Sequence, residues 1–499
     1  LTQIQIPDSV TIIGSGAFWG CENIGTVTFS KNLTEIWRVA FRDCTSLKRA
    51  ELPEGLLRLG CGSSGYYGGA FRGCTALESV YVPSTLEECS VMQSRYYGGN
   101  FEDCPTLKHV VFGEGMPVIP ANLFYNCGGL MEIEIPETVK AIGGSAFYNS
   151  GLESITVPDS VTSYGGAFLQ NCTSLTTAKL SNSVSNIPAS MFSGCSALET
   201  VTIPETVTKI NDSTFQGCAA LKYTSFLPDG ITAVGVKAFQ GCTSLASFTA
   251  PSKLLTIGNN CFQDCKALTD VELHEGLTTI GSYAFQNCAA LEKIALPDTV
   301  TAIGDYCFQK DIAMNDVILS NRLTIIPAYA FANCTSLEEL VIPKGVTTIE
   351  DHAFYQDTKL KTFTIPATVT SIEANAFSYP TTTTVYGVTG SYVETYAKWK
   401  EFIELTKRSG TLGEAEELTW TYDGEEQVIT VAGEELTRDT PVYVAFFDED
   451  GKMLGVIVLY ASDGIEVLDE SDTAKLFWIN ADSFTPKAEA AKIDLNGHD

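Results

Sequence analysis

The fold is decided by the stretch Ala330-Phe331-Ala332-Asn333-Cys334-Thr335-Ser336-Leu337-Glu338-Glu339-Leu340-Val341-Ile342-Pro343. Its residues Leu340 and Ile342 are two positions apart, which is the period of a β-strand with one buried face. Pro343 ends this strand, because proline has no N–H group to donate to a neighbouring strand. The stretch therefore predicts a tight turn that buries Phe331, followed by one short strand.

A second short strand is predicted on the return path of each repeat. After Pro343, the β-branched residues around Val346 and Ile349 lead to the next Ala353-Phe354 pair, and residues of this kind favour strands. The segment between one Phe and the next is too short for a long helix. Each repeat is therefore expected to contain two strands and one turn.

The Phe recurs sixteen times, usually with a spacing of 23 residues. A fixed period in this range is typical of stacked units that cannot bury their apolar faces alone. It predicts a β-rich, right-handed solenoid of about 16 coils with short parallel strands over residues 1–388. The anchors are Phe18, Phe41, Phe71, Phe101, Phe124, Phe147, Phe168, Phe192, Phe215, Phe239, Phe262, Phe285, Phe308, Phe331, Phe354 and Phe377.

Leu337, Leu340 and Ile342 also follow the L-x-x-L-x-L spacing of a leucine-rich repeat. With the Ala-Phe-x-x-Cys motif, this pattern resembles the BspA-like, or Treponema-type, leucine-rich repeats of bacterial surface proteins. The resemblance covers about 385 residues. It implies an extracellular or cell-surface location and attachment to host proteins, other bacteria or surfaces.

Two further segments are predicted after the repeats. In residues 389–408, Ser391 and Glu394 form a capping box, so we expect a helix from about Tyr392 to Lys400 that covers the end of the solenoid, followed by a strand. Residues 409–499 contain strand-forming runs separated by Asp-Gly dipeptides at 423–424, 450–451 and 463–464, which favour hairpins. They predict a small, acidic, antiparallel β-sandwich.

The charge balance limits the possible partners. The chain carries a formal net charge of −29. Such an acidic chain is poorly suited to nucleic acid or to anionic lipid, and it has no apolar run of the length that a membrane span needs. We therefore expect neither nucleic-acid binding nor membrane insertion. Because the chain opens at Leu1 within a repeat, we expect it to be part of a longer protein, and the missing signal peptide is uninformative.

Twelve of the 16 cysteines occupy the last position of the Phe motif, where other repeats have Ser150, Asp311, Asp357 or Pro380. We expect them to be free thiols that pack as small apolar residues. Disulfides between neighbouring coils are the alternative, although parallel side chains at the spacing of stacked strands hold their Cβ atoms too far apart. The absence of C-x-x-C pairs argues against zinc.

Two adjacent repeats are 30 residues long, and each added segment ends in Tyr-Tyr-Gly-Gly. Equivalent insertions in stacked coils project side by side, so their tyrosines can form one cluster that binds a partner. The alternative is that they pack against the solenoid. The candidate partner-binding residues are Tyr66, Tyr67, Tyr81, Tyr96 and Tyr97, with Tyr81 between the two insertions in the sequence.

No catalytic motif is found. The histidines His109, His274, His352 and His498 are scattered, and there is no phosphate-binding loop or nucleophile elbow. We expect no enzyme activity, cofactor or metal. The sequence predicts a non-enzymatic recognition scaffold that binds a protein in an adhesin-like manner. Carbohydrate binding through the Tyr-Tyr-Gly-Gly insertions is the alternative.

Overall fold

The computed structural model of the chain describes residues 2–62, 68–89, 99–224, 227–373, 375–377, 384–386 and 391–392, together with eight strands between 411 and 494. Most repeats form one coil that contains a main strand and a return strand, whereas residues 131–135 form no main strand and Ile187 and Tyr223 form only single bridges to the next coil. Main strands pair in parallel with main strands of adjacent coils, and return strands with return strands. The predicted solenoid with short parallel strands is confirmed.

The main strands follow the Leu-rich part of each repeat. Their bounds are β1 (Gln3–Gln5), β3 (Thr26–Thr28), β5 (Arg49–Glu51), β7 (Ser79–Val82), β9 (His109–Phe112), β12 (Ser154–Thr156), β14 (Thr177–Lys179), β15 (Thr200–Thr202), β18 (Ser247–Thr249), β20 (Asp270–Glu272), β22 (Lys293–Ala295), β24 (Asp316–Ile318), β26 (Glu339–Val341), β28 (Thr362–Thr364) and β30 (Thr384–Tyr386).

The return strands confirm the predicted second strand in most repeats, and in one coil Ile187 makes only a single bridge to Ile210. Their bounds are β2 (Ile12–Ile13), β4 (Glu35–Trp37), β6 (Arg58–Cys61), β8 (Glu88–Cys89), β10 (Val118–Ile119), β11 (Ala141–Ile142), β13 (Ser163–Tyr164), β16 (Lys209–Ile210), β17 (Ala233–Val234), β19 (Thr256–Ile257), β21 (Thr279–Ile280), β23 (Ala302–Ile303), β25 (Ile325–Ile326), β27 (Thr348–Ile349) and β29 (Ser371–Ile372).

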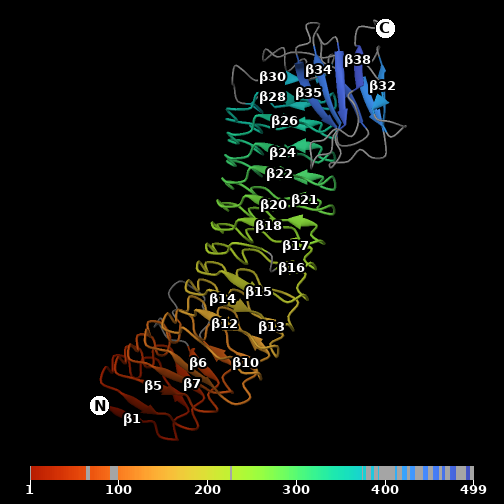
Figure 1. Cartoon of the computed structure of the whole chain (residues 1–499). Coiled ribbons are helices and arrows are strands. Elements are labelled where there is room, and N and C mark those ends of the chain that lie inside the picture. The colour runs from red at the N-terminus through yellow and green to blue at the C-terminus, as the bar shows by residue number, and fades with distance from the viewer. Residues whose placement is uncertain are drawn as a thin grey trace. The chain divides into compact units, whose positions relative to one another are not determined.

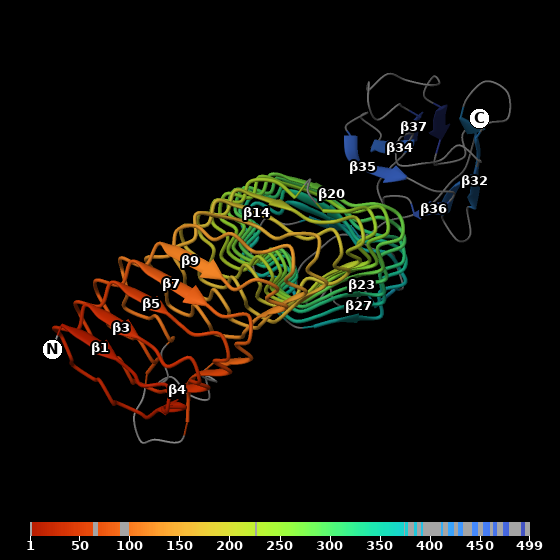
Figure 2. The same ribbon diagram turned by 90° about the horizontal axis from the view of Figure 1, so that it is seen from below.

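The chain divides into two compact units. The first comprises residues 1–320, 327–336 and 352–357, and the second comprises 321–326, 337–351 and 358–499. In the first unit, the coils with β1, β5 and β7 follow one another from the N-terminus (Figure 1). Figure 2 shows β1, β3, β5, β7 and β9 along one side of these coils and β4 on the other. In the second unit, β25, β27 and β29 form one parallel sheet and β26, β28 and β30 another.

The core lies between the main and return strands. In β26, Leu340 is 3% exposed whereas its neighbour Val341 is 45% exposed, as the strand period requires. The Phe rings of successive turns stack in the interior, with ring centroids 5.4 Å apart for Phe239 and Phe262. Burial of such rings is the main source of stability in each coil.

One anchor of the sequence analysis is wrong. The N–H group of Phe147 donates to the carbonyl of Phe168, whereas in other coils the Phe donates to the residue that precedes the next Phe, as Phe124 does to Ala146. Leu169 therefore occupies the Phe position of its coil. The ring of Phe168 stacks instead on Tyr164, with centroids 5.1 Å apart. Two residues separate Leu169 from Cys172, as the Phe-x-x-Cys motif demands.

The C-terminal strands pair antiparallel in two four-stranded sheets, in the orders β31-β32-β33-β36 and β35-β34-β37-β38. Their bounds are β31 (Thr411–Leu412), β32 (Leu418–Asp423), β33 (Val428–Ala432), β34 (Val442–Phe447), β35 (Met453–Leu459), β36 (Asp463–Glu466), β37 (Thr473–Trp478) and β38 (Ala491–Asp494).

Two of the three predicted hairpins agree with this pairing, because β32 pairs with β33 and β34 pairs with β35. Asp463 and Gly464 instead begin β36, which pairs with β33. That the two sheets form a sandwich stays a prediction, as do the domain boundaries. The predicted capping helix and its strand lie outside the described residues, apart from Ser391 and Tyr392.

The glycines that end the two insertions have a structural explanation. A Cβ atom on Gly69 would meet the carbonyl oxygen of Gly99, and one on Gly99 would meet the carbonyl oxygen of Tyr125. The chain thus returns from each insertion to the stack at a point where only glycine leaves room for the next coil. The second Gly of each Tyr-Tyr-Gly-Gly segment serves this close approach.

We predict that Gly69→Ala and Gly99→Ala each lower the free energy of unfolding by about 1–3 kcal/mol, because the new methyl group meets main chain that cannot move aside. Gly128→Ala is the matched control, since a Cβ atom there meets nothing within 4 Å. Thermal unfolding measures all three. Equal melting temperatures for Gly69→Ala and Gly128→Ala would contradict the close approach.

Candidate functional site

The thiols of the Phe motif bond to the main chain of the preceding coil. The Sγ atom of Cys218 lies 3.2 Å from the carbonyl oxygen of Phe192, and that of Cys242 lies 3.2 Å from that of Phe215. All 16 cysteines are free, and all but Cys21 and Cys61 are buried. This arrangement agrees with the expected ladder of free thiols. Motif thiols such as those of Cys218 and Cys242 donate to a carbonyl group of the preceding coil.

We predict that the native protein reacts with a thiol reagent at Cys21 first, because most other thiols are buried. Burial also raises the pKa of Cys61 to about 11 and that of Cys242 to about 12, which suppresses the reactive thiolate at pH 8. Alkylation followed by mass spectrometry checks this, with denatured, non-reduced protein as the control in which all cysteines react. Rapid labelling of Cys242 in native protein would contradict it.

Two acidic residues replace the thiol in this buried position. Oδ1 of Asp311 accepts a hydrogen bond from the N–H group of Cys288 at 2.8 Å, and Oδ1 of Asp357 accepts one from Cys334 at 2.7 Å. In the described part of the chain, Oδ2 of each residue is buried without a hydrogen-bond partner. Burial raises the pKa of both carboxyl groups well above its usual range. A protonated acid can donate from Oδ2, as the thiols do, so both acids are best accommodated in the neutral form.

We predict that Asp311→Asn raises the melting temperature at pH 7.5 and raises it much less at pH 4. The folded carboxyl group has a raised pKa, so its favourable contribution is present below the unfolded value of 3.8 and is lost as the pH rises. The amide mimics the neutral acid at every pH. Asp316→Asn, on the exposed surface of β24, is the control. A gain for Asp311→Asn that does not depend on pH would contradict a neutral Asp311.

The outer side of the Phe turns carries a row of partly exposed side chains with binding chemistry, of which Trp19 is exposed and the others are half-buried. We call the residues that directly follow the Phe in the first six coils the N-terminal row: Trp19, Arg42, Arg72, Glu102, Tyr125 and Tyr148. Phe41 donates its N–H group to the carbonyl of Ala70 and Phe71 to that of Asn100, so the turns stack in register. The row is therefore continuous from coil to coil.

The first half of the N-terminal row is held by charge and by an aromatic ring. The guanidinium carbon of Arg42 lies 5.0 Å from the ring centroid of Trp19. Asp43 accepts a hydrogen bond from Nε1 of Trp19 at 3.1 Å and lies 3.3 Å from Nε of Arg42. Trp19 is 44% exposed. These contacts fix the orientation of a large ring that remains accessible to a partner.

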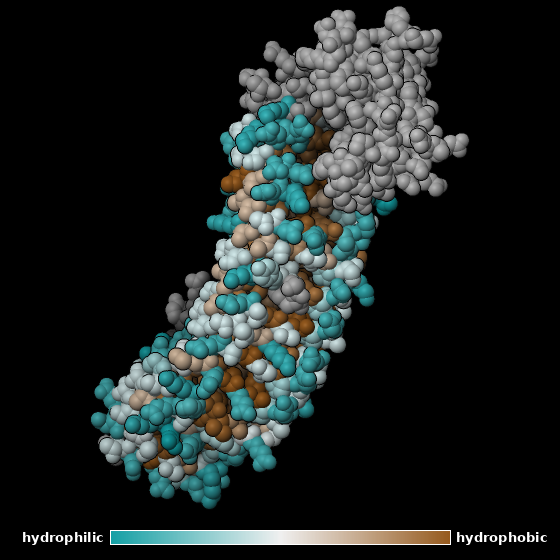
Figure 3. Space-filling model, viewed as in Figure 1, coloured by the Kyte–Doolittle hydropathy of each residue, from teal (hydrophilic) through white to brown (hydrophobic). Residues whose placement is uncertain are grey.

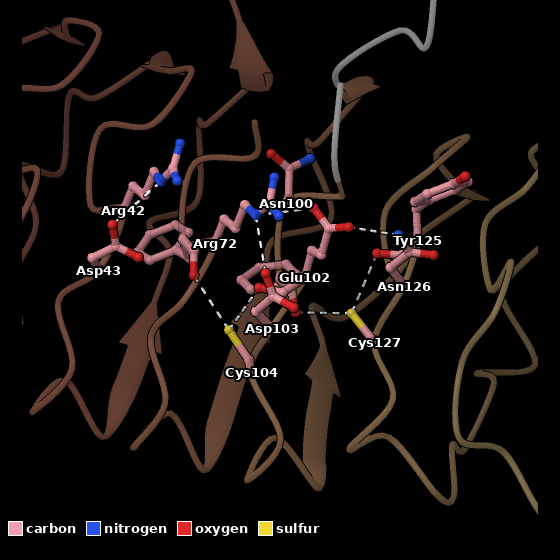
Figure 4. A network of polar contacts seen from close by, with 12 residues as sticks. Arg42, Asp43, Arg72, Asn100, Glu102, Asp103, Cys104, Tyr125, Asn126 and Cys127 are labelled. Atoms are coloured by element: carbon pink, nitrogen blue, oxygen red, sulfur yellow. Dashed lines mark hydrogen bonds and ion pairs between the residues drawn. The ribbon is translucent and has the colours of Figure 1, made fainter. Parts of the chain in front are cut away.

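The second half continues with the ion pairs and hydrogen bonds around Glu102 (Figure 4) and then with a pair of stacked rings. Nε of Arg72 lies 3.2 Å from Glu102 and 3.1 Å from Asp103. Glu102 also accepts a hydrogen bond from Nδ2 of Asn126 at 2.6 Å. The rings of Tyr125 and Tyr148 stack with centroids 4.5 Å apart and planes within 4°. Most members of the row are thus oriented by a neighbour before any partner binds.

The predicted site residues are only partly visible. Tyr66, Tyr67, Tyr96 and Tyr97 lie outside the described residues. Tyr81 lies in β7, in the sheet of main strands, whereas the insertions follow the return strands β6 and β8. Its hydroxyl donates to Oε1 of Glu54 at 2.7 Å, and this contact raises the pKa of Tyr81 to about 12. A role for Tyr81 in binding stays a prediction.

The insertions and the N-terminal row meet at Gly68. A Cβ atom on this residue would lie 3.4 Å from the side chain of Arg72 and 4.0 Å from that of Arg42. The first insertion therefore rejoins the stack beside the row. Sequence analysis missed the row itself, although reading the residue after each Phe would have shown the succession Trp, Arg, Arg, Glu, Tyr and Tyr.

The part of the chain that the structure describes contains no group of three His, Cys, Asp or Glu side chains that could hold a metal ion. Among the same residues, no helix has the length and apolar character needed to cross a membrane. In Figure 3 the apolar side chains of the viewed face form a narrow band between polar ones.

Comparison with known proteins identifies the repeats. The family described as BspA type Leucine rich repeat region matches residues 1–93, 97–222, 220–310 and 256–384. The chain belongs to this family. BspA-type proteins are repeat scaffolds of the bacterial-surface type and are generally non-enzymatic, and leucine-rich repeats in general bind proteins or other ligands. Among curated proteins, none matches the chain.

Solved structures include similar repeats. A leucine-rich repeat protein from Bacteroides ovatus is 25% identical, with a TM-score of 0.61, and the match covers 72% of this chain and 92% of that one. A leucine-rich cell surface protein from Faecalibacterium prausnitzii is 26% identical, with a TM-score of 0.37, and the match covers 70% and 89% of the two chains. The likeness to the Bacteroides protein supports the fold of this BspA-type chain.

Proposed function

We propose that this BspA-type chain is a non-enzymatic recognition scaffold of the bacterial cell surface that binds a protein partner through the N-terminal row. The observation that carries the proposal is the composition of that row. Trp, Arg and Tyr are the residue types that contribute most to the binding energy of protein interfaces. Here they occupy five of six consecutive coils on one side of the stack, with Trp19 exposed and the others half-buried.

The row is also preorganised. The cation–π contact between Arg42 and Trp19 and the stack of Tyr125 on Tyr148 hold these side chains in place. Side chains that are already ordered lose less conformational entropy when a partner binds. The mixture of Arg72 and Arg42 with acidic neighbours suits a protein surface that carries both signs of charge.

The insertions extend the proposed surface. The first insertion rejoins the stack at Gly68, beside Arg42 and Arg72. We propose that Tyr66, Tyr67, Tyr96 and Tyr97 contribute further contacts to the same partner. Stack stability does not explain seven added residues in each of two coils, since ordering a longer loop costs conformational entropy.

A panel of extracellular-matrix and cell-surface proteins tests the proposal with the double variant Trp19→Ser/Arg72→Lys. Trp19→Ser removes the exposed ring. Arg72→Lys removes the planar guanidinium, which can bind a carboxylate through two parallel hydrogen bonds, but keeps the positive charge. We expect it to weaken capture of the partner by about tenfold or more while the melting temperature changes little.

Tyr223→Ser is the matched control, because Tyr223 is 58% exposed and lies outside the row. We expect this variant to bind as the parent does. Equal binding by the parent and by Trp19→Ser/Arg72→Lys would overturn the assignment to the row. A parent that captures no protein of the panel would overturn protein recognition itself.

A further inference from the structure

A second ordered set of side chains lies on the Phe turns of later coils. We call Tyr283, Tyr306, Tyr329 and His352 the tyrosine row; each stands two positions before the Phe of its coil. Neighbouring rings in the row have centroids 4.6 Å apart and planes within 6° of each other. Each ring is half-buried, so the stack presents its edges to solvent.

The backbone does not require aromatic residues here. The three tyrosines have φ angles of 56–59°, in a left-handed region that bulky side chains rarely adopt. At the same position other coils have Asn122, Ser190 or Gly16, also with positive φ. These smaller residues adopt the same turn conformation. The conformation of the turn therefore does not explain why successive coils have aromatic residues at this position.

A row of amides runs beside the rings. The glutamine row consists of Gln216, Gln240, Gln263, Gln286 and Gln309, each directly after the Phe of its coil. Nε2 of each glutamine donates to Oε1 of the next, so all the amides point the same way. Because a primary amide has two N–H groups and two lone pairs, each member inside the row can still donate once more, and Gln240 and Gln286 can also accept once more.

The two rows are neighbours on the turn. Nδ2 of Asn260, which precedes the tyrosine row by one coil in the same position, donates to Oε1 of Gln263 at 2.9 Å. At the other end, the ring of His352 contacts that of Tyr355, with centroids 4.8 Å apart. The two rows overlap in the coils of Phe285 and Phe308, which carry both a phenol and an amide, and together they span the coils from Phe215 to Phe354.

We propose that the tyrosine row and the glutamine row together form a binding strip for a linear, uncharged polysaccharide. Phenol and amide side chains offer both donors and acceptors, which suit the hydroxyl groups of sugars. Neither row contains Lys, Arg, Asp or Glu, although the chain as a whole carries a net charge of −29. Within the two rows an anionic polymer would find no cation and a basic protein no carboxylate, although Asp264 and Lys310 directly follow Gln263 and Gln309 in the sequence.

The repeat of the strip matches a repeating ligand. A linear polysaccharide presents hydroxyl groups at regular intervals, and each sugar unit that hydrogen-bonds to one coil favours the same contact with the next. The faces of the tyrosine rings are covered by their neighbours, so sugars contact the hydroxyl groups and ring edges. Many weak, equivalent contacts on a preformed surface add up to useful affinity.

The sharpest test is the triple variant Tyr283→Phe/Tyr306→Phe/Tyr329→Phe on an array of neutral and charged glycans. It removes three hydroxyl groups and keeps every ring, so the stack stays intact. We expect the parent to bind neutral linear glycans and the variant to bind them about tenfold more weakly, with an unchanged melting temperature. Gln263→Met/Gln286→Met replaces two amides with apolar side chains of similar size. We expect this variant to weaken binding of neutral linear glycans as well.

Tyr125→Phe/Tyr148→Phe is the matched control, because these rings also stack between coils but belong to the N-terminal row. We expect it to bind glycans as the parent does. A parent that binds no glycan, or only charged glycans, would overturn the proposal, and so would equal binding by the parent and the triple Phe variant. The proposal does not depend on protein recognition by the N-terminal row, since the two sets of variants change different coils.

Discussion

The hydrogen bonds between successive Phe turns determine what the rest of the structure can be. Phe262 donates its N–H group to the carbonyl of Ala284 at 2.7 Å, and Phe308 donates to that of Ala330 at 2.8 Å. Each bond fixes the register of one coil on the next, so a residue at a given place in the turn lies over its counterpart. Side chains therefore meet in rows, inside as rings and thiols and outside as charges, amides and phenols.

The sequence was sufficient for the period and for both strands of a coil, because the buried positions are nearly constant. It misplaced one coil, in which Ala167-Phe168 imitates the motif although Leu169 occupies the buried position. The residue type favoured Phe168, whereas the spacing to Cys172 and the main-chain bonds to the neighbouring coils identify Leu169. The surface rows could have been read from the sequence, but their internal contacts depend on register, and the tyrosines of the insertions lie outside the described residues.

The buried positions of the Phe turn accept fewer residue types than the exposed positions. Inside, a thiol can be replaced by an acid only if a main-chain partner is available, as Asp311 has in Cys288. Outside, the residue after the Phe changes in blocks of several coils, from the N-terminal row to the glutamine row. A stack in which each coil contacts only its neighbours allows such blocks to differ without affecting distant coils.

This separation of stability from surface chemistry makes the chain suitable for recognition. Loss of a buried ring such as Phe239 is expected to cost about 3–5 kcal/mol, whereas an exposed ion pair such as that between Arg72 and Asp103 contributes about 0–1 kcal/mol. Exposed side chains can therefore be exchanged at little cost to the fold. The same turn can therefore present charged and aromatic groups in one block and neutral amides and phenols in another.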